Sequence, residues 1–254
     1  MDNQGYELRH LARCGSTNSV LLAERGLARS VLLLADEQTA GRGRRGRRWH
    51  SAPGEGLTLS LAVVLRRPLR ELAALPLVAG VAVARALHAL GVARAALKWP
   101  NDIVVDGAKL GGILVETRSL NGAIKAVIGV GINLRGAAEL RTRLGREVAA
   151  LEQFVAVADK SVLAGAIATS LLALLAAFEA RGLDAVRADW DRLDAHAGQK
   201  LRVRLADGRV LTGVASGLEA DGALRLATRG GMRTVRSGRV VSARATLASR
   251  ARTA

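Results

Sequence analysis

Aromatic residues and cysteine are scarce in this chain of 254 residues, and each scarcity excludes something. Only six residues are aromatic, so the apolar half of the sequence has to build its core from Leu, Val, Ala and Ile. The single cysteine, Cys14, excludes an internal disulfide, and the four scattered histidines give no metal-ligand spacing, so no structural zinc is expected. No signal-peptide pattern opens the chain, and no uninterrupted apolar run reaches the roughly 18 residues of a membrane span. We therefore expect a cytoplasmic protein.

The length and the spacing of turn residues divide the chain into two parts. At 254 residues it is at the upper end of what one hydrophobic core serves. From Gly198 onward, short alternating runs are separated by Asp-Gly and Gly-Gly pairs, which predicts four or five strands in a small barrel. We therefore predict a large domain over residues 1–195, a barrel over residues 196–246 and a frayed tail over residues 247–254.

The large domain reads as a sheet flanked by helices. Apolar runs and helical periodicity predict strands over residues 31–35, 57–65, 103–105, 112–116 and 123–128, and helices over residues 72–90, 161–180 and 183–194. The last three strands are separated by Asp106-Gly107 and Asn121-Gly122, and such pairs are the strongest short-range hairpin signals. The sequence therefore predicts an α+β fold with a mixed or antiparallel sheet.

An arginine-glycine loop spans residues 41–48, and Trp49 closes it. Five arginines and three glycines fill the loop, with no acidic residue among them. Two like charges about 4 Å apart repel by roughly 4 kcal/mol at an effective dielectric constant of about 20, so the loop either stays solvated or binds an anion such as phosphate. Its glycine spacing matches the dinucleotide fingerprint, but no apolar helix follows, and the Gly-Lys-Ser/Thr of a Walker loop is absent from the sequence after it. The loop thus indicates phosphate binding without either scaffold.

A second motif, Lys98-Trp99-Pro100-Asn101-Asp102, combines a cation, an aromatic ring, a rigid proline and a carboxylate in front of a predicted strand. The pattern is typical of a turn with an Asx hydrogen bond. It also suits chemistry, because Lys98 can reach a phosphate and Asp102 can hold Mg²⁺ or accept a proton. Both interpretations stay open for this motif alone.

Three further motifs stand beside predicted strands or a helix. Lys109 precedes two glycines, Gly111 and Gly112, which permit a ligand to approach a strand closely, although one lysine alone can be a surface residue. Asn133 ends a glycine-rich strand with a side chain that both donates and accepts hydrogen bonds. Residues 16–18 read Ser-Thr-Asn before an apolar helical stretch, and they can be an ordinary helix cap or a set of ligand-binding groups.

In this order and spacing, the motifs at residues 16–18, 41–49, 98–102, 109–114 and 129–133 resemble the biotin protein ligase family, and the resemblance continues through the C-terminal barrel. It implies a catalytic domain like that of class II aminoacyl-tRNA synthetases and an SH3-like barrel. It also implies that ATP with Mg²⁺ converts biotin to biotinyl-5′-AMP with release of pyrophosphate, and that biotin then passes to a lysine of a biotin carboxyl carrier protein domain. Since only about 15 residues precede Ser16, we expect the monofunctional form without the N-terminal DNA-binding domain.

The resemblance also implies roles for individual residues. The expected catalytic residues are Arg44, Lys98, Lys109 and Asp102. The expected biotin-binding residues are Ser16, Thr17, Asn18, Gln38, Arg42, Gly43, Arg44, Lys109, Gly111, Gly112 and Ile113. The expected nucleotide-binding residues are Arg42, Arg44, Trp49, Lys98, Asn101 and Asn133, with Trp49 as the surface on which adenine stacks. No tightly bound metal is expected.

The net charge of +16 raises a rival interpretation, a nucleic-acid-binding module. Without the five loop charges the chain still carries +11, but these arginines are dispersed, so we expect weak non-specific adhesion and no specific nucleic-acid partner. A lipoate protein ligase is a nearer rival, because it resembles this fold and chemistry with a different acyl chain. The arginine-glycine loop and the motif at residues 98–102 argue against it. We expect no membrane partner and either a monomer or a homodimer.

Overall fold

The computed structural model describes residues 5–50, 52–120, 122–156 and 159–244. Its elements in chain order, with η for a 3₁₀ turn, are β1 (Tyr6–Cys14), α1 (Thr17–Ala23), β2 (Ser30–Gln38), η1 (Arg44–Gly46), β3 (Gly56–Leu65), η2 (Glu71–Ala74), α2 (Leu75–Ala89), β4 (Ala95–Lys98), β5 (Asp102–Val105), β6 (Ala108–Leu120), β7 (Ala123–Asn133), α3 (Ala137–Leu144), η3 (Leu151–Gln153), α4 (Lys160–Arg181), η4 (Gly182–Ala185) and α5 (Arg187–Leu193). The C-terminal strands are β8 (Lys200–Leu205), β9 (Val210–Leu218), β10 (Leu224–Thr228), β11 (Gly231–Val235) and β12 (Gly238–Arg244). The tail expected over residues 247–254 lies outside the described residues.

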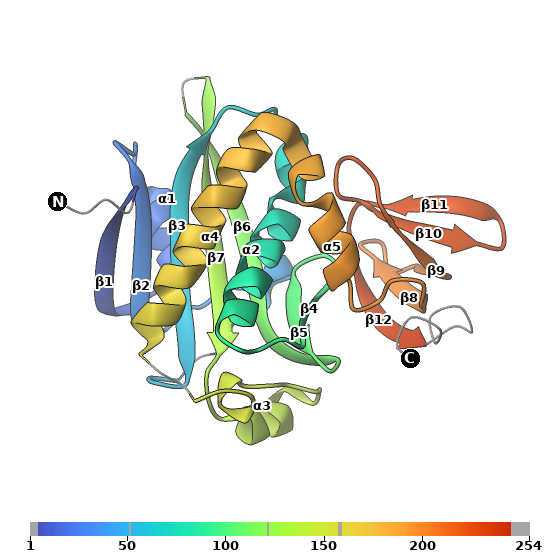
Figure 1. Cartoon of the computed structure of the whole chain (residues 1–254), viewed down its shortest axis with the longest axis horizontal. Coiled ribbons are helices and arrows are strands. Elements are labelled where there is room, and N and C mark those ends of the chain that lie inside the picture. Colours follow the sequence, from blue (N-terminus) through green and yellow to red (C-terminus); the bar gives the residue numbers. More distant parts are fainter. Residues whose placement is uncertain (1–4, 51, 121, 157–158, 245–254) are drawn as a thin grey trace.

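The large sheet has seven strands in the order β1-β2-β3-β7-β6-β5-β4 (Figure 1). β1 runs parallel to β2, and the other neighbours are antiparallel, so the sheet is mixed. The predicted hairpins join β5 to β6 and β6 to β7, and Gly107 and Gly122 have the positive φ that such turns require. The α+β fold and the antiparallel meander are therefore confirmed.

Alternate residues of β2 face opposite sides of the sheet. Leu32 and Leu34 belong to the main core beneath α2 and α4, whereas Val31 and Leu33 pack with Leu21 of α1 in a smaller core. A continuous apolar run is what a strand buried on both faces requires, because side chains alternate along a strand. The packing fixes α1 on one face of the sheet, so that its first turn lies at the site described below.

Two helical segments, Glu71–Ala89 and Lys160–Ala185, are long and apolar enough to cross a membrane by length and composition alone. The sequence criterion of an uninterrupted apolar run did not reveal them, because charged residues such as Arg85 and Glu179 interrupt them. In the structure both pack against each other and the main sheet, with core residues such as Val81 and Ile167 fully buried. They correspond to the helices predicted over residues 72–90 and 161–180.

The C-terminal strands form a five-stranded antiparallel sheet in the order β11-β10-β9-β8-β12. β11 and β12 are its two edges, so within the described residues the closed barrel expected from the sequence is not observed. The sheet docks on the large domain through Trp99, whose Nε1 donates to the Gly222 carbonyl at 3.1 Å, and through Arg187, whose Nη1 donates to the Leu218 carbonyl at 3.0 Å. This docking brings β12 beside the site (Figure 1).

Candidate functional site

A cavity of about 530 Å³ lies between the arginine-glycine loop, strands β6 and β7 of the large sheet, and β12. Its lining includes all but two of the residues singled out in the sequence, namely Ser16, Thr17, Asn18, Gln38, Arg42, Gly43, Arg44, Trp49, Lys98, Asn101, Asp102, Lys109, Gly112 and Ile113. The two exceptions are Gly111 and Asn133. Motifs that are up to about 100 residues apart in the sequence therefore converge on one cavity.

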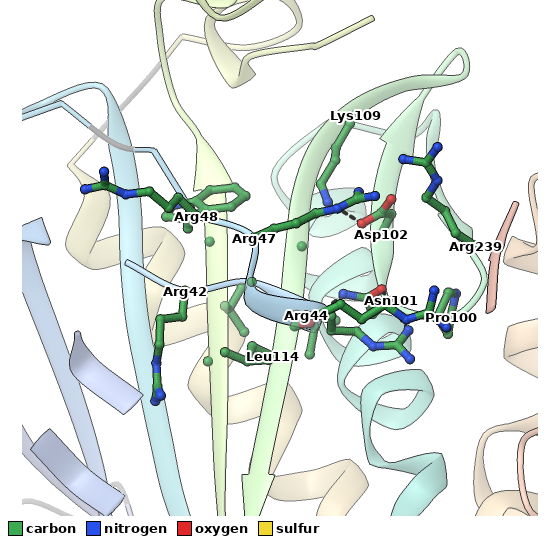
Figure 2. A pocket seen from close by; sticks show the side chains of 18 of the residues that line it. Arg42, Arg44, Arg47, Arg48, Pro100, Asn101, Asp102, Lys109, Leu114 and Arg239 are labelled. Carbon is green, nitrogen blue, oxygen red and sulfur yellow. Dashed lines mark hydrogen bonds and ion pairs between the residues drawn. The ribbon is translucent and has the colours of Figure 1, made fainter. Parts of the chain in front are cut away.

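The arginine-glycine loop is a small hairpin that lies across the cavity (Figure 2). Gly43 N donates to the Arg47 carbonyl at 2.7 Å and Trp49 N donates to the Gly41 carbonyl at 2.9 Å. The tip is the single 3₁₀ turn η1, in which Arg45 and Gly46 have positive φ. No α-helix starts at these glycines, which confirms that the loop is not a dinucleotide-binding fingerprint.

The loop arginines have separate destinations. Arg42 Nη2 donates to Glu116 Oε2 at 2.8 Å, so β6 supplies the acidic partner that the loop sequence lacks. Arg44 Nη1 lies 3.4 Å from Asn101 Oδ1. Burial, followed by the charge of Arg45, lowers the pKa of Arg44, with Asp102 acting in the opposite direction. A half-buried guanidinium of this kind is stabilised by an anionic ligand.

Lys109, the second residue of β6, and Asp102, the first residue of the neighbouring strand β5, form an ion pair (Figure 2). Asn101, beside them, is fixed to β6, because its Nδ2 donates to the Ile113 carbonyl at 2.7 Å and its own carbonyl accepts from Ile113 N at 3.0 Å. A Cβ on Gly112 would lie 3.1 Å from Lys109 Nζ, so the missing side chain gives the lysine its space.

Six cationic side chains line this part of the cavity, and together with Asp102 they are called the cationic end: Arg44, Arg47, Lys98, Lys109, Arg146 and Arg239. Burial is the largest cause that lowers the pKa of Lys98; Asp102 raises it, while Lys109, Arg239 and Arg146 lower it further. In the described part of the chain, no group of three or more His, Cys, Asp and Glu side chains could hold a metal ion. The cationic end therefore suits a polyanion.

Polar groups without charge gather at the first turn of α1; these are the buried residues Ser16, Thr17, Asn18 and Ser60 and the half-buried Gln38, and together they are called the neutral end. Gln38 Oε1 accepts from Thr17 N at 2.8 Å and from Thr17 Oγ1 at 3.1 Å. Ser60 Oγ lies 2.6 Å from Asn18 Oδ1 and 2.7 Å from Thr17 Oγ1, and the Asn18 amide donates to Glu116 at 2.9 Å. Ser16 makes no side-chain capping bond, so the simple helix-cap interpretation is not supported for it.

The two ends lie at different levels of the β6–β7 ladder. Leu114 pairs with Gly129 at the neutral end, while Gly112 pairs with Gly131 nearer to Lys109. At about 3.3 Å per residue, Lys109 and Leu114 are roughly 16 Å apart along β6. An elongated ligand can therefore contact both ends, and Figure 2 shows Lys109 near the top of the view and Leu114 well below it.

The ring of Trp49 packs against the backbone of β7 at the level of Gly112 and Gly131. A Cβ on Gly131 would lie 2.4 Å from Trp49 Cε2, so only glycine allows this contact. Trp49 Nε1 is buried and has no hydrogen-bond partner among the described residues. A buried indole N–H normally finds an acceptor, so a ligand acceptor atom beside Trp49 would complete the site.

The structure places two predicted residues elsewhere and adds several that the sequence did not indicate. Gly111 faces β7, where a Cβ would lie 2.6 Å from the Gly131 carbonyl. Asn133 is buried and donates to the Ala149 carbonyl at 3.0 Å, so it holds the chain beyond β7. The residues added by the structure are Ser60 and Glu116, which support the neutral end, and residues 144–146 and 238–241, which line the cavity.

Comparison with protein families gives two matches, one in the large domain and one in the C-terminal sheet. Residues 12–133 match the biotin/lipoate A/B protein ligase family, and residues 196–241 match the biotin protein ligase C-terminal domain. The first match contains every cavity-lining residue between Ser16 and Gly131. The second match contains the lining residues of β12.

Individual proteins show the same similarity. The chain is 33% identical over 245 residues to a biotin--[acetyl-CoA-carboxylase] ligase of Mycobacterium tuberculosis, covering 94% of this chain and 90% of the relative. It is 34% identical over 213 residues to the bifunctional ligase/repressor BirA of Escherichia coli, where the match covers 83% of this chain but only 66% of the relative. The crystal structure of an Aquifex aeolicus biotin protein ligase with biotin and ATP superimposes with a TM-score of 0.78 at 27% identity, covering 94% of this chain and 99% of that chain.

Proposed function

Because the chain belongs to the biotin protein ligase family, we propose that it activates biotin with ATP and transfers the biotinyl group to a lysine of a biotin carboxyl carrier protein domain. The observation that carries the proposal is the single cavity that joins the neutral end to the cationic end. Biotin combines a neutral polar ring with an apolar chain and a carboxylate, and ATP is a polyanion. The two ends match these two substrates.

In the first step, a carboxylate oxygen of biotin attacks the α-phosphorus of ATP. A phosphorus–oxygen bond forms, the bond to the bridging oxygen of the β-phosphate breaks, and pyrophosphate leaves with the electron pair. Two anions must meet, so Arg44, Lys98 and Lys109 act by neutralising them and by stabilising the charge that develops. We propose that magnesium enters with ATP as the substrate complex.

In the second step, the neutral amine of the carrier lysine attacks the acyl carbon of biotinyl-5′-AMP. The bond from that carbon to the phosphate oxygen breaks, and AMP leaves with the electron pair. The amine gives up a proton, and Asp102 is our candidate for the group that accepts it or positions the amine. Its ion pair with Lys109 places a carboxylate at this point of the cavity.

The neutral end is proposed to bind biotin. Ser16, Thr17, Asn18 and Gln38 surround the polar ring, Arg42 and Gly43 cover it, and Gly112 and Ile113 form the floor under the acyl chain. Trp49 is proposed as the adenine-stacking surface, and Asn101 as a nucleotide contact beside Arg44. Gly111 and Asn133 act instead through the backbone arrangement of β6 and β7.

We also propose the finer features of fold and partnership that the sequence suggests. These are a large domain related to class II aminoacyl-tRNA synthetases over residues 1–195 and a C-terminal SH3-like barrel over residues 196–246. The register shifts in the β9–β10 and β8–β12 pairs support a strongly bent C-terminal sheet. We also propose a cytoplasmic monomer or homodimer without a specific nucleic-acid or membrane partner. The absence of a nucleic-acid partner is supported by the many surface arginines that are paired with carboxylates, as in Arg9 with Glu7.

Calorimetric titration with biotin, with and without ATP, together with biotin-dependent pyrophosphate release, tests the proposed function. We expect biotin to bind alone, to stimulate pyrophosphate release in the presence of ATP and Mg²⁺, and to label a carrier domain. Lipoate, the substrate of the nearest rival, is expected to stimulate no release. Release that is independent of biotin, or equal with lipoate, would overturn the assignment.

A further inference from the structure

One carboxylate oxygen joins the arginine-glycine loop to the neutral end. Glu116 Oε2 accepts a hydrogen bond from Arg42 Nη2 at 2.8 Å and another from Asn18 Nδ2 at 2.9 Å. Arg42 belongs to the loop and Asn18 to the first turn of α1. Hydrogen bonds in which one partner is ionised are roughly twice as strong as neutral ones, so this oxygen is a strong link between the two segments.

Glu116 itself does not line the cavity that contains the two ends, which is called the main cavity here. It lines a second cavity of about 430 Å³, and Arg42 lines both. On β7, Val127 is the partner of Glu116 and packs with Leu21 of α1, so Glu116 is on the face of the sheet that carries α1. Figure 2 shows the Arg42 side chain pointing away from Arg44. Glu116 therefore acts on a ligand in the main cavity through other residues.

On the side of the neutral end, Glu116 fixes the orientation of the Asn18 amide. Asn18 is 3% exposed, and its Nδ2 donates to the Leu114 carbonyl at 3.2 Å as well as to Glu116, while its Oδ1 accepts from Ser60 Oγ at 2.6 Å. Both N–H groups of the amide are thus used. The reverse orientation would place Oδ1 against two acceptors, so the carboxylate keeps Oδ1 on the side of Ser60.

On the side of the loop, Glu116 supplies the charge that holds the hairpin at its base. Arg42 pairs with Arg48 in an isolated β-bridge, where the two arms of the loop meet. In the described part of the chain, the pair with Glu116 is the one ion pair that a loop arginine makes. Repulsion among the five loop arginines favours an open loop, and this ion pair opposes it.

We propose that Glu116 is a positioning residue that couples biotin binding to closure of the arginine-glycine loop, because one oxygen holds the Asn18 amide and the Arg42 guanidinium together. This inference rests on the proposed function, because that function places biotin at the neutral end. A ligand that holds Asn18 in place also keeps Glu116 in place for Arg42. Such coupling is reciprocal, so a closed loop in turn retains the ligand.

Three variants of the full chain separate this role from a general effect on the fold. Glu116→Gln keeps the shape of the side chain and removes its charge, and Arg42→Ala removes the loop partner. Glu7→Gln is the matched control, because Glu7 Oε1 also accepts from an arginine, Arg9, at 2.6 Å, and Glu7 lines neither cavity. Each glutamine variant changes the net charge by the same amount.

Biotin calorimetry, the KM for ATP at saturating biotin, and hydrogen exchange of the loop test the proposal. For Glu116→Gln we expect biotin affinity to fall about tenfold, as for loss of a hydrogen bond to a charged group, while the KM for ATP stays within about twofold. Without biotin, the Gly43 and Trp49 amides, which donate within the hairpin, should exchange about tenfold faster. The loss in the double variant with Arg42→Ala should be smaller than the product of the single losses, because both changes break one contact. Glu7→Gln should match the wild type.

Unchanged biotin affinity in Glu116→Gln would overturn the proposal, as would an equal loss in Glu7→Gln, a parallel tenfold rise in the KM for ATP, or a double-variant loss equal to the product of the single losses. If Glu116→Gln does not fold, Arg42→Ala decides, since wild-type exchange of the loop in that variant would also overturn the proposal. A failure of the proposed function would appear instead as wild-type protein that does not bind biotin. The exchange comparison still decides whether Glu116 holds the loop in that case, because it requires no ligand.

Discussion

The neutral and cationic ends of the cavity treat their polar groups in opposite ways. At the neutral end, Ser60, Thr17 and Asn18 hydrogen-bond within the protein and are buried. At the cationic end, Lys98 and Arg239 have neighbours of the same sign. A satisfied network is rigid before ligand arrives and recognises shape and hydrogen-bonding pattern, whereas a group of like charges gains most of its stabilisation from the ligand. Substitutions at one end should therefore affect one substrate selectively.

The largest effect is expected at the cationic end from Lys109→Met. This change removes the cation and leaves Asp102 unpaired, so both charge neutralisation and orientation are lost. We expect biotin-dependent pyrophosphate release to fall by about 10²- to 10³-fold, the range for loss of one preorganised electrostatic group. Lys200→Met, at an exposed lysine of β8, is the control. A fall of less than threefold in Lys109→Met would remove this residue from the catalytic group.

A pair of glycine substitutions compares the two ends directly. A Cβ on Gly129 would lie 2.4 Å from Asn18 Oδ1, which is buried and fixed by Ser60, whereas a Cβ on Gly112 would meet the flexible end of Lys109 at 3.1 Å. Overpacking a rigid site costs about 1–3 kcal/mol, so Gly129→Ala should weaken biotin binding by about 5- to 150-fold. Gly112→Ala should instead act mainly through Lys109 and raise the KM for ATP, and its effect on biotin affinity should be smaller than that of Gly129→Ala although Gly112 also forms part of the floor under the acyl chain.

Gly165→Ala is the control for these two variants, because nothing lies within 4 Å of its Cβ position in α4. It should raise the free energy of unfolding by about 0.5–1 kcal/mol, the helical preference for alanine, and should leave both substrates unaffected. Equal effects of Gly129→Ala and Gly112→Ala on biotin affinity, measured by calorimetry, would contradict the division of the cavity into two ends.

A smaller and more selective effect is expected from Ser60→Ala at the neutral end. The change leaves Asn18 Oδ1 without its donor in a buried position, and an unsatisfied buried acceptor costs about 1–3 kcal/mol. Biotin affinity should fall about tenfold while the KM for ATP stays within twofold. Thr58→Val is the matched control, because Thr58 is on the same strand as Ser60 but does not line the cavity. Its Oγ1 donates to the Ala35 carbonyl of β2 at 2.8 Å. It should cost stability without loss of biotin affinity.

The sequence predicted the parts of this site that depend on local chemistry. Gly112, Gly129 and Gly131 stand where a side chain lies directly against a strand. A glycine inside an apolar strand pattern can be recognised from a few residues of sequence. The mixed sheet and its hairpins follow from apolar runs and Asp-Gly or Asn-Gly turns. Local pattern was therefore sufficient for the centre of the large domain.

The features that the sequence did not predict depend on long-range contacts or weak local patterns. Glu116 reaches Arg42 across 74 positions, and Arg239 reaches the cavity because another sheet docks there. β1 and α3 carry many charged residues, and β4 has only four residues, so none of them gives a clear apolar period. Ser60, a polar residue inside an apolar run, was the one local signal that could have been followed.

The smallest expected effect concerns the contact that joins the loop to the C-terminal sheet. Arg45 Nη2 donates to Ser237 Oγ at 3.1 Å, and Arg45 holds a positive φ of 57° in doing so. An exposed hydrogen bond of this kind contributes about 0.5–1.5 kcal/mol, so Arg45→Ala and Ser237→Ala should each speed release of biotinyl-5′-AMP by about two- to tenfold. The double variant should be no faster than the faster single variant, because both changes break the same contact.

The control is Ser242→Ala, at an exposed serine of β12, which should leave the release rate unchanged. Additive single effects would show that Arg45 acts on the intermediate directly, which would assign it to the cationic end rather than to the anchoring of the loop.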